Sequence, residues 1–367
     1  MNDRDLDLLQ EWHYELPPEL IASRPPERRE DARLMVLNRS QSSIAHHTIR
    51  DIPQLLAAHD VLVFNNTRVL PARLYGVRSA TGGKWEGLFV SENSPGNWTI
   101  LCETRGRLQV GESIDVIPAQ TMKTDKEAGQ LSTPPGLRLT LREKLADGAW
   151  NAELSVAGSP EQILNDFGSL PLPPYMGRRM ADEDDRQRYQ TLFASQPGAI
   201  AAPTAGLHFT PELLDQCRSR GITSTELTLH VGIGTFRPVT VARLSEHSMH
   251  EEWCCVPESA SLEIQKAKNH GGRVIAVGTT CVRTLESAAV QHEGRIQPWQ
   301  GRTNIFIRPG FRFQSIDCLL TNFHLPGSTL LALTAAFAGY DLVMEAYRQA
   351  VSDRYRFFSY GDAMLIV

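Results

Sequence analysis

The chain has 367 residues, of which 37 are Lys or Arg and 42 are Asp or Glu, so its formal net charge at pH 7 is -5. Hydrophobic residues make up 41% and charged residues 22%, which excludes intrinsic disorder, collagen and coiled coil as descriptions of the whole chain. The mild acidity excludes a generally basic nucleic-acid binder, because phosphate binding rewards clustered Lys and Arg.

The N-terminal segment predicts no targeting signal. It is acidic and lacks the apolar run, of about 7–15 residues, of a signal peptide. The longest apolar stretch, Leu325–Tyr340, contains Pro326 and Gly327 and falls short of the roughly 20 apolar residues that cross a bilayer. We therefore expect a cytoplasmic protein that does not span a membrane.

The first half of the chain predicts mostly strands. Short apolar strands are expected at Leu34–Leu37 and Val61–Phe64. Between Leu70 and Val156, short segments of strand composition alternate with Gly-rich turns and show no helical period, which favours a small antiparallel barrel or sandwich. Ala119–Pro135 lacks apolar periodicity and predicts a mobile loop.

After Ser159 the pattern changes to mixed helices and strands. Thr210 and Pro211 are typical of a helix start, and Gly221 of a helix end. The further predicted elements are strands at 222–231 and Arg273–Val277, a helix at 281–289, a helix at Ser328–Ala338, and a last strand, Ala363–Ile366, that closes a sheet. We predict a large mixed α/β domain, residues 1–68 and 157–367, with a small antiparallel β-barrel domain inserted at 69–156.

Two segments are candidates for anion binding. Gln196–Pro211 has no charged residue and leads into a helix N-terminus, where backbone N–H groups can hold a carboxylate or phosphate. A buried connector is the alternative. The turn before Arg283 presents amides and hydroxyls for a carboxylate or ribose, whereas the alternative is a capped helix with a surface pair between Arg283 and Glu286.

Aromatic and basic clusters suggest contact with nucleic acid. Phe357, Phe358 and Tyr360 precede the last strand and either stack on a base or belong to the core. Two groups of basic residues without intervening acids suggest phosphate binding, with a solvated face as the alternative. These groups are Arg68, Arg73, Arg78 and Lys84, and Arg302, Arg308 and Arg312.

The segment HSMHEEWCC suggests a metal site. His247, His250, Cys254 and Cys255 lie within nine residues, and imidazole and thiolate suit zinc. Adjacent cysteines have poor geometry for one tetrahedral ion, so an ordinary loop is favoured. No CxxC spacing occurs, and we read the six cysteines as free thiols.

Eight motifs, in order along the chain, together resemble one family. They are FNNTRVLPARL (64–74), LPLPPYMGR (170–178), PGAIAAPTAGLHFT (197–210), LTLHVGIGTF (227–236), HSMHEEW (247–253), VIAVGTTCVRTLES (274–287), LLTNFHLPGSTLLAL (319–333) and YRFFSYGDAMLI (355–366). The chain resembles the S-adenosylmethionine:tRNA ribosyltransferase-isomerases of queuosine biosynthesis.

The resemblance implies a cytoplasmic tRNA-modification transferase with an inserted β-barrel. S-adenosylmethionine is then a co-substrate that donates its ribosyl carbons, and no prosthetic group or metal is expected. The acceptor is the 7-aminomethyl-7-deazaguanine base at the wobble position of tRNA. The products are epoxyqueuosine in tRNA, adenine and methionine, and the protein is expected to be a monomer.

The matched motifs also imply site residues. His208 and His230 are the expected acid/base residues, because imidazole titrates near neutrality. The expected substrate-binding residues are Asn66 and Arg68 for tRNA or its base, Thr204, Gly206 and Thr279 for S-adenosylmethionine, Arg283 for its carboxylate, Asn322 and His324 for ribose hydroxyls, and Phe358 and Asp362. A non-catalytic tRNA-binding protein and a zinc-dependent hydrolase that uses His247 and His250 are the alternatives.

Overall fold

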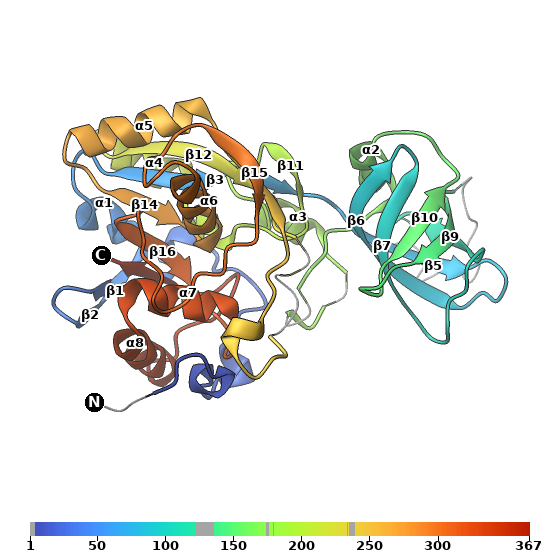
Figure 1. Cartoon of the computed structure of the whole chain (residues 1–367), viewed down its shortest axis with the longest axis horizontal. Helices are drawn as coiled ribbons and strands as arrows, with labels where there is room; N and C mark the ends of the chain where they lie inside the picture. The colour runs from blue at the N-terminus through green and yellow to red at the C-terminus, as the bar shows by residue number, and fades with distance from the viewer. Residues whose placement is uncertain are drawn as a thin grey trace. The chain divides into compact units, whose positions relative to one another are not determined.

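The chain folds into two compact units, each described here by itself. The computed structural model describes residues 4–119, 121, 136–173, 176–178, 180–232, 234 and 239–367. The larger unit comprises Met1–Arg68, Pro174–Gly177 and Gln187–Val367, and the smaller comprises Val69–Pro173 and Arg178–Arg186 (Figure 1). The domain boundaries expected at 68/69 and 156/157 stay a prediction. The predicted loop at Ala119–Pro135 lies outside the described residues, apart from Ala119 and Thr121.

The larger unit is built on a nine-stranded sheet. In spatial order its strands are β15 (Trp299–Thr303), β13 (Glu252–Val256), β12 (Thr223–Leu229), β3 (Val61–Asn65), β14 (Val274–Val277), β16 (Cys318–Asn322), β17 (Ala363–Ile366), β1 (Arg33–Asn38) and β2 (Ser43–Thr48). The four strands β12, β3, β14 and β16 run parallel to one another. A separate two-stranded sheet pairs β4 (Thr67–Val69) with β11 (Gln196–Ala199).

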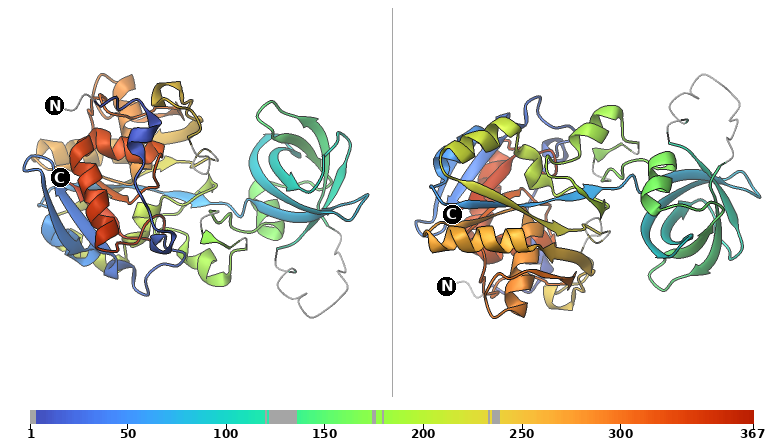
Figure 2. Two further views of the ribbon diagram at one scale, coloured as in Figure 1. Left: turned by 90° about the horizontal axis from the view of Figure 1, so that it is seen from below. Right: turned by 90° about the horizontal axis from the view of Figure 1, so that it is seen from above.

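Helices cover both faces of this sheet, so its inner strands β3, β14, β16 and β17 are buried throughout. The helices are α1 (Ile52–Leu55), α4 (Pro211–Ser219), α5 (Glu258–Asn269), α6 (Thr279–Gln291), α7 (Thr329–Ala338) and α8 (Tyr340–Ser352). Along β3, Val61 and Val63 pack into the core that contains α5 to α8, whereas Leu62 and Phe64 pack into the core that contains α1 and α4. Figure 2 shows α5 and α4 on opposite faces of the sheet.

The last strand occupies the interior of the sheet. We expected Ala363–Ile366 to close a sheet, but β17 lies between β16, to which it is antiparallel, and β1, to which it is parallel. All four residues of β17 are buried, as an interior strand covered on both faces requires. The β1–β2 hairpin therefore forms this edge of the sheet.

The smaller unit is a closed barrel of six antiparallel strands. Around the barrel they are β10 (Trp150–Leu154), β7 (Asn97–Thr104), β6 (Lys84–Ser94), β5 (Arg73–Arg78), β8 (Ser113–Ile117) and β9 (Arg138–Lys144). Trp85, Trp98 and Leu139 fill its interior and are at most 1% exposed. The smaller unit also holds α2 (Pro160–Phe167), and α3 (Glu183–Arg188) spans the division between units. The predicted fold class, mixed α/β with an antiparallel barrel, is confirmed.

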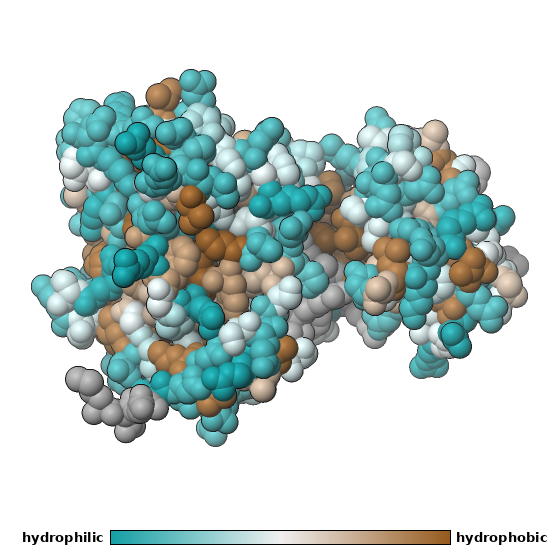
Figure 3. Space-filling view, in the orientation of Figure 1, coloured by the Kyte–Doolittle hydropathy of each residue, from teal (hydrophilic) through white to brown (hydrophobic). Residues whose placement is uncertain are grey.

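Among the described residues, no single helix is long and apolar enough to cross a bilayer; α7 and α8 reach that length and hydropathy only jointly, across a bend of 118°. Most of α7 is buried in the core. On the face drawn in Figure 3, apolar surface of the larger unit gathers over α6 and α7.

The uncharged stretch before α4 is more regular than expected. Gly and Pro are frequent in Gln196–Pro211 and disfavour a helix or a central strand. The stretch nevertheless contains the strand β11 and the 3-10 helix η7 (Thr204–His208). As predicted, Thr210 caps α4, because its hydroxyl accepts from the backbone N–H of Leu213 over 3.3 Å. This cap marks the start of α4, two residues after the end of η7 at His208.

Candidate functional site

Polar residues gather at one edge of the large sheet. The carboxyl ends of β12, β3, β14 and β16 share this edge because these strands are parallel, and the antiparallel strands β13 and β17 begin there. The polar residues that precede, begin, end or follow these strands are Asn65, His230, Glu252, Thr279, Asn322 and Asp362. Open α/β sheets bind their ligands at this kind of edge.

Thr204, His208 and Asn322 form a hydrogen-bonded cluster at this edge. The Thr204 hydroxyl donates to Asn322 Oδ1 over 2.9 Å, and Asn322 Nδ2 lies 3.2 Å from His208 Nε2. Burial, aided by the charge of Arg29, lowers the pKa of His208 to about 4. His208 is therefore neutral at pH 7, contrary to the expectation that it titrates near neutrality, and its Nε2 accepts from the Asn322 amide.

Arginine charges surround this cluster, and the sequence did not reveal them. Arg29 donates to three backbone carbonyl oxygens at 3.1–3.4 Å, and Arg356 adds positive charge near His208. In the sequence, Glu27 and Glu30 stand close to Arg29 and dilute its charge. Burial lowers the pKa of both arginines, which remain cationic because free guanidinium titrates above about 12. The cluster therefore lies in a positive potential that favours an anionic ligand.

His230 is held from several sides at the end of β12. Its Nδ1 lies 2.8 Å from the Thr67 hydroxyl, and its ring stacks on Trp253 with centroids 5.1 Å apart. The backbone of Gly198 passes so close that a Cβ there would lie 2.8 Å from the ring. Partial burial lowers the pKa of His230, so its imidazole is neutral at pH 7 in a fixed orientation.

A cavity of about 220 Å³ lies beside the start of β13, and a buried ion pair lines it. Arg283 Nη1 donates to Glu252 Oε2, and the two side chains are only 7% and 6% exposed. The alternative of a surface pair between Arg283 and Glu286 is wrong. Glu286 is buried and accepts from the hydroxyl and the backbone N–H of Ser315.

Phe358 lines the same cavity in an unusual backbone conformation. Its φ of 76° lies in the left-handed region, which costs a bulky residue about 1–3 kcal/mol and is often found at functional sites. Phe357 and Tyr360 are buried at 0% and 3% exposure, so the core interpretation holds for these two. Phe358 is the aromatic side chain of the three that the structure places on a cavity.

Asp362 is occupied by protein donors. Its carboxylate accepts from the backbone N–H groups of Arg33 and Arg356, and from the Arg33 guanidinium through Nε and Nη2, at 2.8–3.2 Å. An ionised carboxylate offers about four such positions. Asp362 therefore positions these two arginines, and its contact with substrate stays a prediction.

The structure also places the remaining predicted binding residues. Asn66 follows β3 and accepts from the Thr228 hydroxyl over 2.7 Å. Arg68 lies on β4, Gly206 on η7, and Thr279 begins α6. Asn66 and Thr279 thus follow β3 and β14, whereas Arg68 and Gly206 lie within β4 and η7. Contact of these four residues with ligands stays a prediction.

His324 lies on the cavity, two residues beyond β16. Its Nε2 is 3.0 Å from the Thr321 hydroxyl, and complete burial lowers the pKa of His324 to about 3. His208 and His324 both take up protons near pH 6.5 when unfolded, but only near pH 4 or below when folded. The unfolded chain thus binds more protons between these values, so stability falls as the pH is lowered through this range.

We expect His324→Gln to reduce this acid destabilisation. Removing one such group should lower the slope of unfolding free energy against pH by up to about 1.4 kcal/mol per pH unit between pH 6 and 4. Urea unfolding at several pH values measures the slope. The exposed His13→Gln serves as control and should keep the wild-type slope. An unchanged slope in His324→Gln would mean that His324 is protonated in the folded protein.

The two predicted basic groups are partly neutralised. Arg78 pairs with Glu112, and Arg308 pairs with Asp7 at 2.6 Å. The hydrogen bond from Arg78 lowers the pKa of Glu112. The charge available to phosphates in each group is therefore smaller than the sequence indicated.

The suggested metal ligands are not gathered. Cys254 and Cys255 are consecutive on β13, so their side chains point to opposite faces. Burial raises the pKa of Cys254 to about 12, which disfavours the thiolate that binds zinc. His247 and His250 line the cavity, and within the described ranges no three His, Cys, Asp or Glu side chains are placed to hold one metal ion.

Sequence reasoning missed Glu252 and Arg29 as members of the site. Glu252 lies within the motif HSMHEEW, which we had read for metal ligands. An acidic residue at the start of a strand, in a motif shared with a family, was the available signal. For Arg29 no local signal existed, because its neighbours in the sequence are acidic and its partners come from distant segments.

Known proteins resemble this chain over nearly its whole length. The profile of a family described as queuosine biosynthesis protein matches residues 9–366. Relatives from Natranaerobius thermophilus and Desulfitobacterium hafniense, both named S-adenosylmethionine:tRNA ribosyltransferase-isomerase, are each 44% identical over 359 residues, which covers 98% of this chain and 99% of the relative.

A solved structure points the same way. The crystal structure of an S-adenosylmethionine tRNA ribosyltransferase from Thermotoga maritima is 34% identical with a TM-score of 0.53, and it covers 97% of this chain and 100% of that one. Because the profile, the relatives and the solved structure all match nearly end to end, the chain belongs to the S-adenosylmethionine:tRNA ribosyltransferase-isomerase family of queuosine biosynthesis, a family of transferase enzymes.

Proposed function

We propose that this chain transfers and isomerises the ribosyl moiety of S-adenosylmethionine onto a 7-aminomethyl-7-deazaguanine base at the wobble position of tRNA. The products are epoxyqueuosine in tRNA, adenine and methionine. The main support is the 44% identity to ribosyltransferase-isomerases over 98% of the chain. The gathering of the matched motifs at one edge of the sheet agrees with this proposal.

The reaction begins at the carbon next to the sulfonium. The positive sulfur acidifies this 5′ carbon, and a general base removes a proton from it. The carbanion expels the ring oxygen from the adjacent carbon, so the ring opens to an alkene. The freed oxyanion collapses to an aldehyde and expels adenine, which takes up a proton. The exocyclic amine of the acceptor base adds to the alkene and gives up a proton, and the carbanion that this leaves beside the sulfonium attacks the aldehyde carbon. The alkoxide formed there displaces methionine, which departs with the electron pair of the carbon–sulfur bond as the epoxide closes. The amine must be unprotonated to attack, which a water-poor pocket favours.

The two histidines take different roles in this proposal. His230 is the base, since it is neutral, partly exposed and fixed by Thr67 and Trp253. His208 works with Asn322 and Thr204 on the ribose hydroxyls and the departing adenine, because this cluster holds an unprotonated imidazole in a positive potential. Both assignments require these rings to contact the donor.

The remaining contacts are assigned from the matched motifs. Arg283 holds the methionine carboxylate, Phe358 stacks on a base, and His324 contacts the ribose. Thr279 and Gly206 line the donor site through α6 and η7, while Asn66 and Arg68 hold the tRNA or its modified base. We further propose a cytoplasmic monomer without a prosthetic group or metal, which size-exclusion chromatography and metal analysis of the purified protein test.

Adenine release is the decisive measurement. The protein is mixed with S-adenosylmethionine and tRNA carrying 7-aminomethyl-7-deazaguanine, and the products are separated by chromatography. We expect adenine and methionine with this tRNA and neither with unmodified tRNA, which is the control.

Two other outcomes would contradict the proposal. Formation of S-adenosylhomocysteine would mean methyl transfer from the same donor. Tight tRNA binding without any adenine would favour the non-catalytic tRNA-binding protein, and the family relationship would then describe fold alone.

A further inference from the structure

Arg283, which lines the cavity, has a buried guanidinium that is only partly paired. Arg283 donates a hydrogen bond from Nη1 to Glu252. Its Nε and Nη2 are buried and have no hydrogen-bond partner within the described part of the chain. Leaving charged donors unpaired and out of water is unfavourable. Nε and Nη2 form one edge of the guanidinium plane, and this edge matches the two oxygens of a carboxylate. The unpaired edge is therefore suited to bind a carboxylate ligand.

Glu252 supplies the opposite charge beside this edge. Its Oε1 accepts from the backbone N–H of Gly232 over 2.8 Å, and its Oε2 accepts from Arg283. Because a carboxylate accepts about four hydrogen bonds, Glu252 retains capacity for a cationic donor. A cation-binding carboxylate next to a carboxylate-binding guanidinium is the arrangement that a zwitterion requires.

The size and walls of the cavity restrict this ligand further. At about 220 Å³ it is smaller than the roughly 300–1,000 Å³ of pockets that hold drug-sized ligands, so it suits a fragment rather than a whole nucleoside donor. Val239, Met249, Leu325 and Leu330 provide apolar wall. An unbranched apolar chain fits this lining.

We propose that this cavity is the subsite for the α-amino-acid end of the donor. Arg283 binds the carboxylate through Nε and Nη2, Glu252 binds the ammonium group, and the apolar walls contact the methylenes. Glu252 thereby becomes a substrate-binding residue. The inference rests on the proposed function, since it assumes S-adenosylmethionine as the donor.

Donors that lack one end group test the subsite. Adenine release is compared for S-adenosylmethionine, its decarboxylated form and its desamino form, each with modified tRNA. We expect wild-type KM to rise about 10²-fold without the carboxylate and about tenfold without the ammonium group, while kcat changes little. A rise in KM below about threefold for both analogues, relative to S-adenosylmethionine, would contradict the assignment of the subsite. Adenine release from S-adenosylmethionine would still support the proposed function.

A double variant tests whether the ion pair between Arg283 and Glu252 causes the higher KM of the truncated donors. Glu252→Gln with Arg283→Met removes both charges, so neither is left buried and unpaired. In this variant the KM for S-adenosylmethionine should rise, and removing the donor carboxylate should cost less than about threefold. The matched control is Asp60→Asn with Arg273→Met, which deletes another ion pair away from the cavity and should keep the wild-type ratios. If removal of the donor carboxylate raised KM by the same factor in both double variants, the inference would be wrong.

A third variant covers the case in which the double variant fails to fold. Leu330→Trp fills the cavity from a partly exposed position and leaves the ion pair intact, so it should raise KM for S-adenosylmethionine at least about tenfold. Calorimetric binding of the three donors gives the same ratios without turnover. If the proposed function is wrong, no donor releases adenine. If only the subsite is wrong, adenine is released and the three donors have similar KM values and affinities.

Discussion

His208→Gln should slow adenine release by about 10²- to 10⁴-fold, the range expected when a group that assists proton transfer is lost. Glutamine is uncharged and similar in size, so the core around position 208 should remain packed. It does not reproduce the imidazole that meets Asn322 Nδ2 at 3.2 Å. Single-turnover assays with modified tRNA separate the chemical step from substrate binding, and KM for S-adenosylmethionine should change much less than kcat.

The pH dependence provides a second arm of this test. Because burial lowers the pKa of His208 to about 4, the wild-type rate should not fall through pH 6.5 on account of this residue. A fall in that range that persists in His208→Gln would belong to another group. The control is His46→Gln, which lies away from the cluster beside Tyr355 and should keep wild-type turnover. Normal adenine release by His208→Gln would remove His208 from the mechanism.

Asp362→Ala should destabilise the larger unit by about 3 kcal/mol or more. The backbone N–H groups of Arg33 and Arg356 would lose their acceptor, and each unsatisfied donor costs about 1–3 kcal/mol. The Arg33 guanidinium would lose its carboxylate partner as well. The midpoint of urea unfolding, followed by circular dichroism, measures the change.

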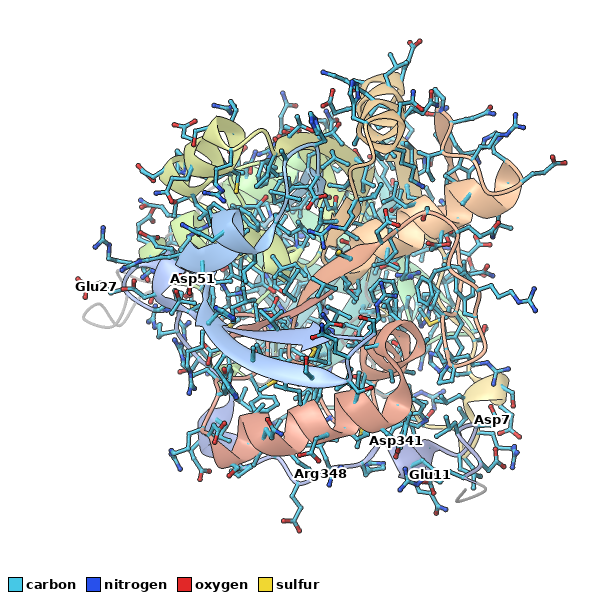
Figure 4. The ribbon with its side chains drawn as sticks, turned by 90° about the vertical axis from the view of Figure 1, so that its left-hand side faces the viewer. Asp7, Glu11, Glu27, Asp51, Asp341 and Arg348 are labelled. Carbon is cyan, nitrogen blue, oxygen red and sulfur yellow. The ribbon has the colours of Figure 1, made fainter. Side chains whose placement is uncertain are left out.

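The matched control is Asp341→Ala. Asp341 lies on α8 and forms an ion pair with Arg4. The Asp341 side chain is 90% exposed and points outward (Figure 4). Exposed ion pairs contribute about 0–1 kcal/mol, so the control should unfold close to the wild type. If Asp362→Ala kept full stability and instead raised KM for S-adenosylmethionine, the originally predicted contact with substrate would be supported.

Local patterns in the sequence were sufficient for much of the fold. The barrel was predictable because its strands are short, evenly spaced and separated by Gly-rich turns. The strand and helix at 274–291 were predictable because the strand is apolar throughout and a turn follows it at once. The interior position of β17 was not predictable, since its partners β1 and β16 are set by long-range packing that no local period records.

The candidate site was predictable where motifs supplied it, and only in part elsewhere. Thr204, His208 and Asn322 were expected from the resemblance, and the structure brings them together. The low pKa of His208 was not predictable, because the sequence does not reveal how deeply an imidazole is buried. Arg283 and Glu252 are 31 residues apart, and charged residues in a sequence normally indicate exposed positions.

The interior position of β17 also constrains the order in which the chain can assemble during synthesis. Arg33 and Asp362, which tie β1 to β17, are 329 residues apart. The β1–β2 hairpin is translated early, yet it has no neighbour in the sheet until β17 has left the ribosome. A two-stranded hairpin is marginally stable in water, and an unpaired strand edge is prone to aggregate. The nascent protein therefore exposes this edge for almost the whole of translation, and its yield should depend on chaperones that shield the N-terminal strands.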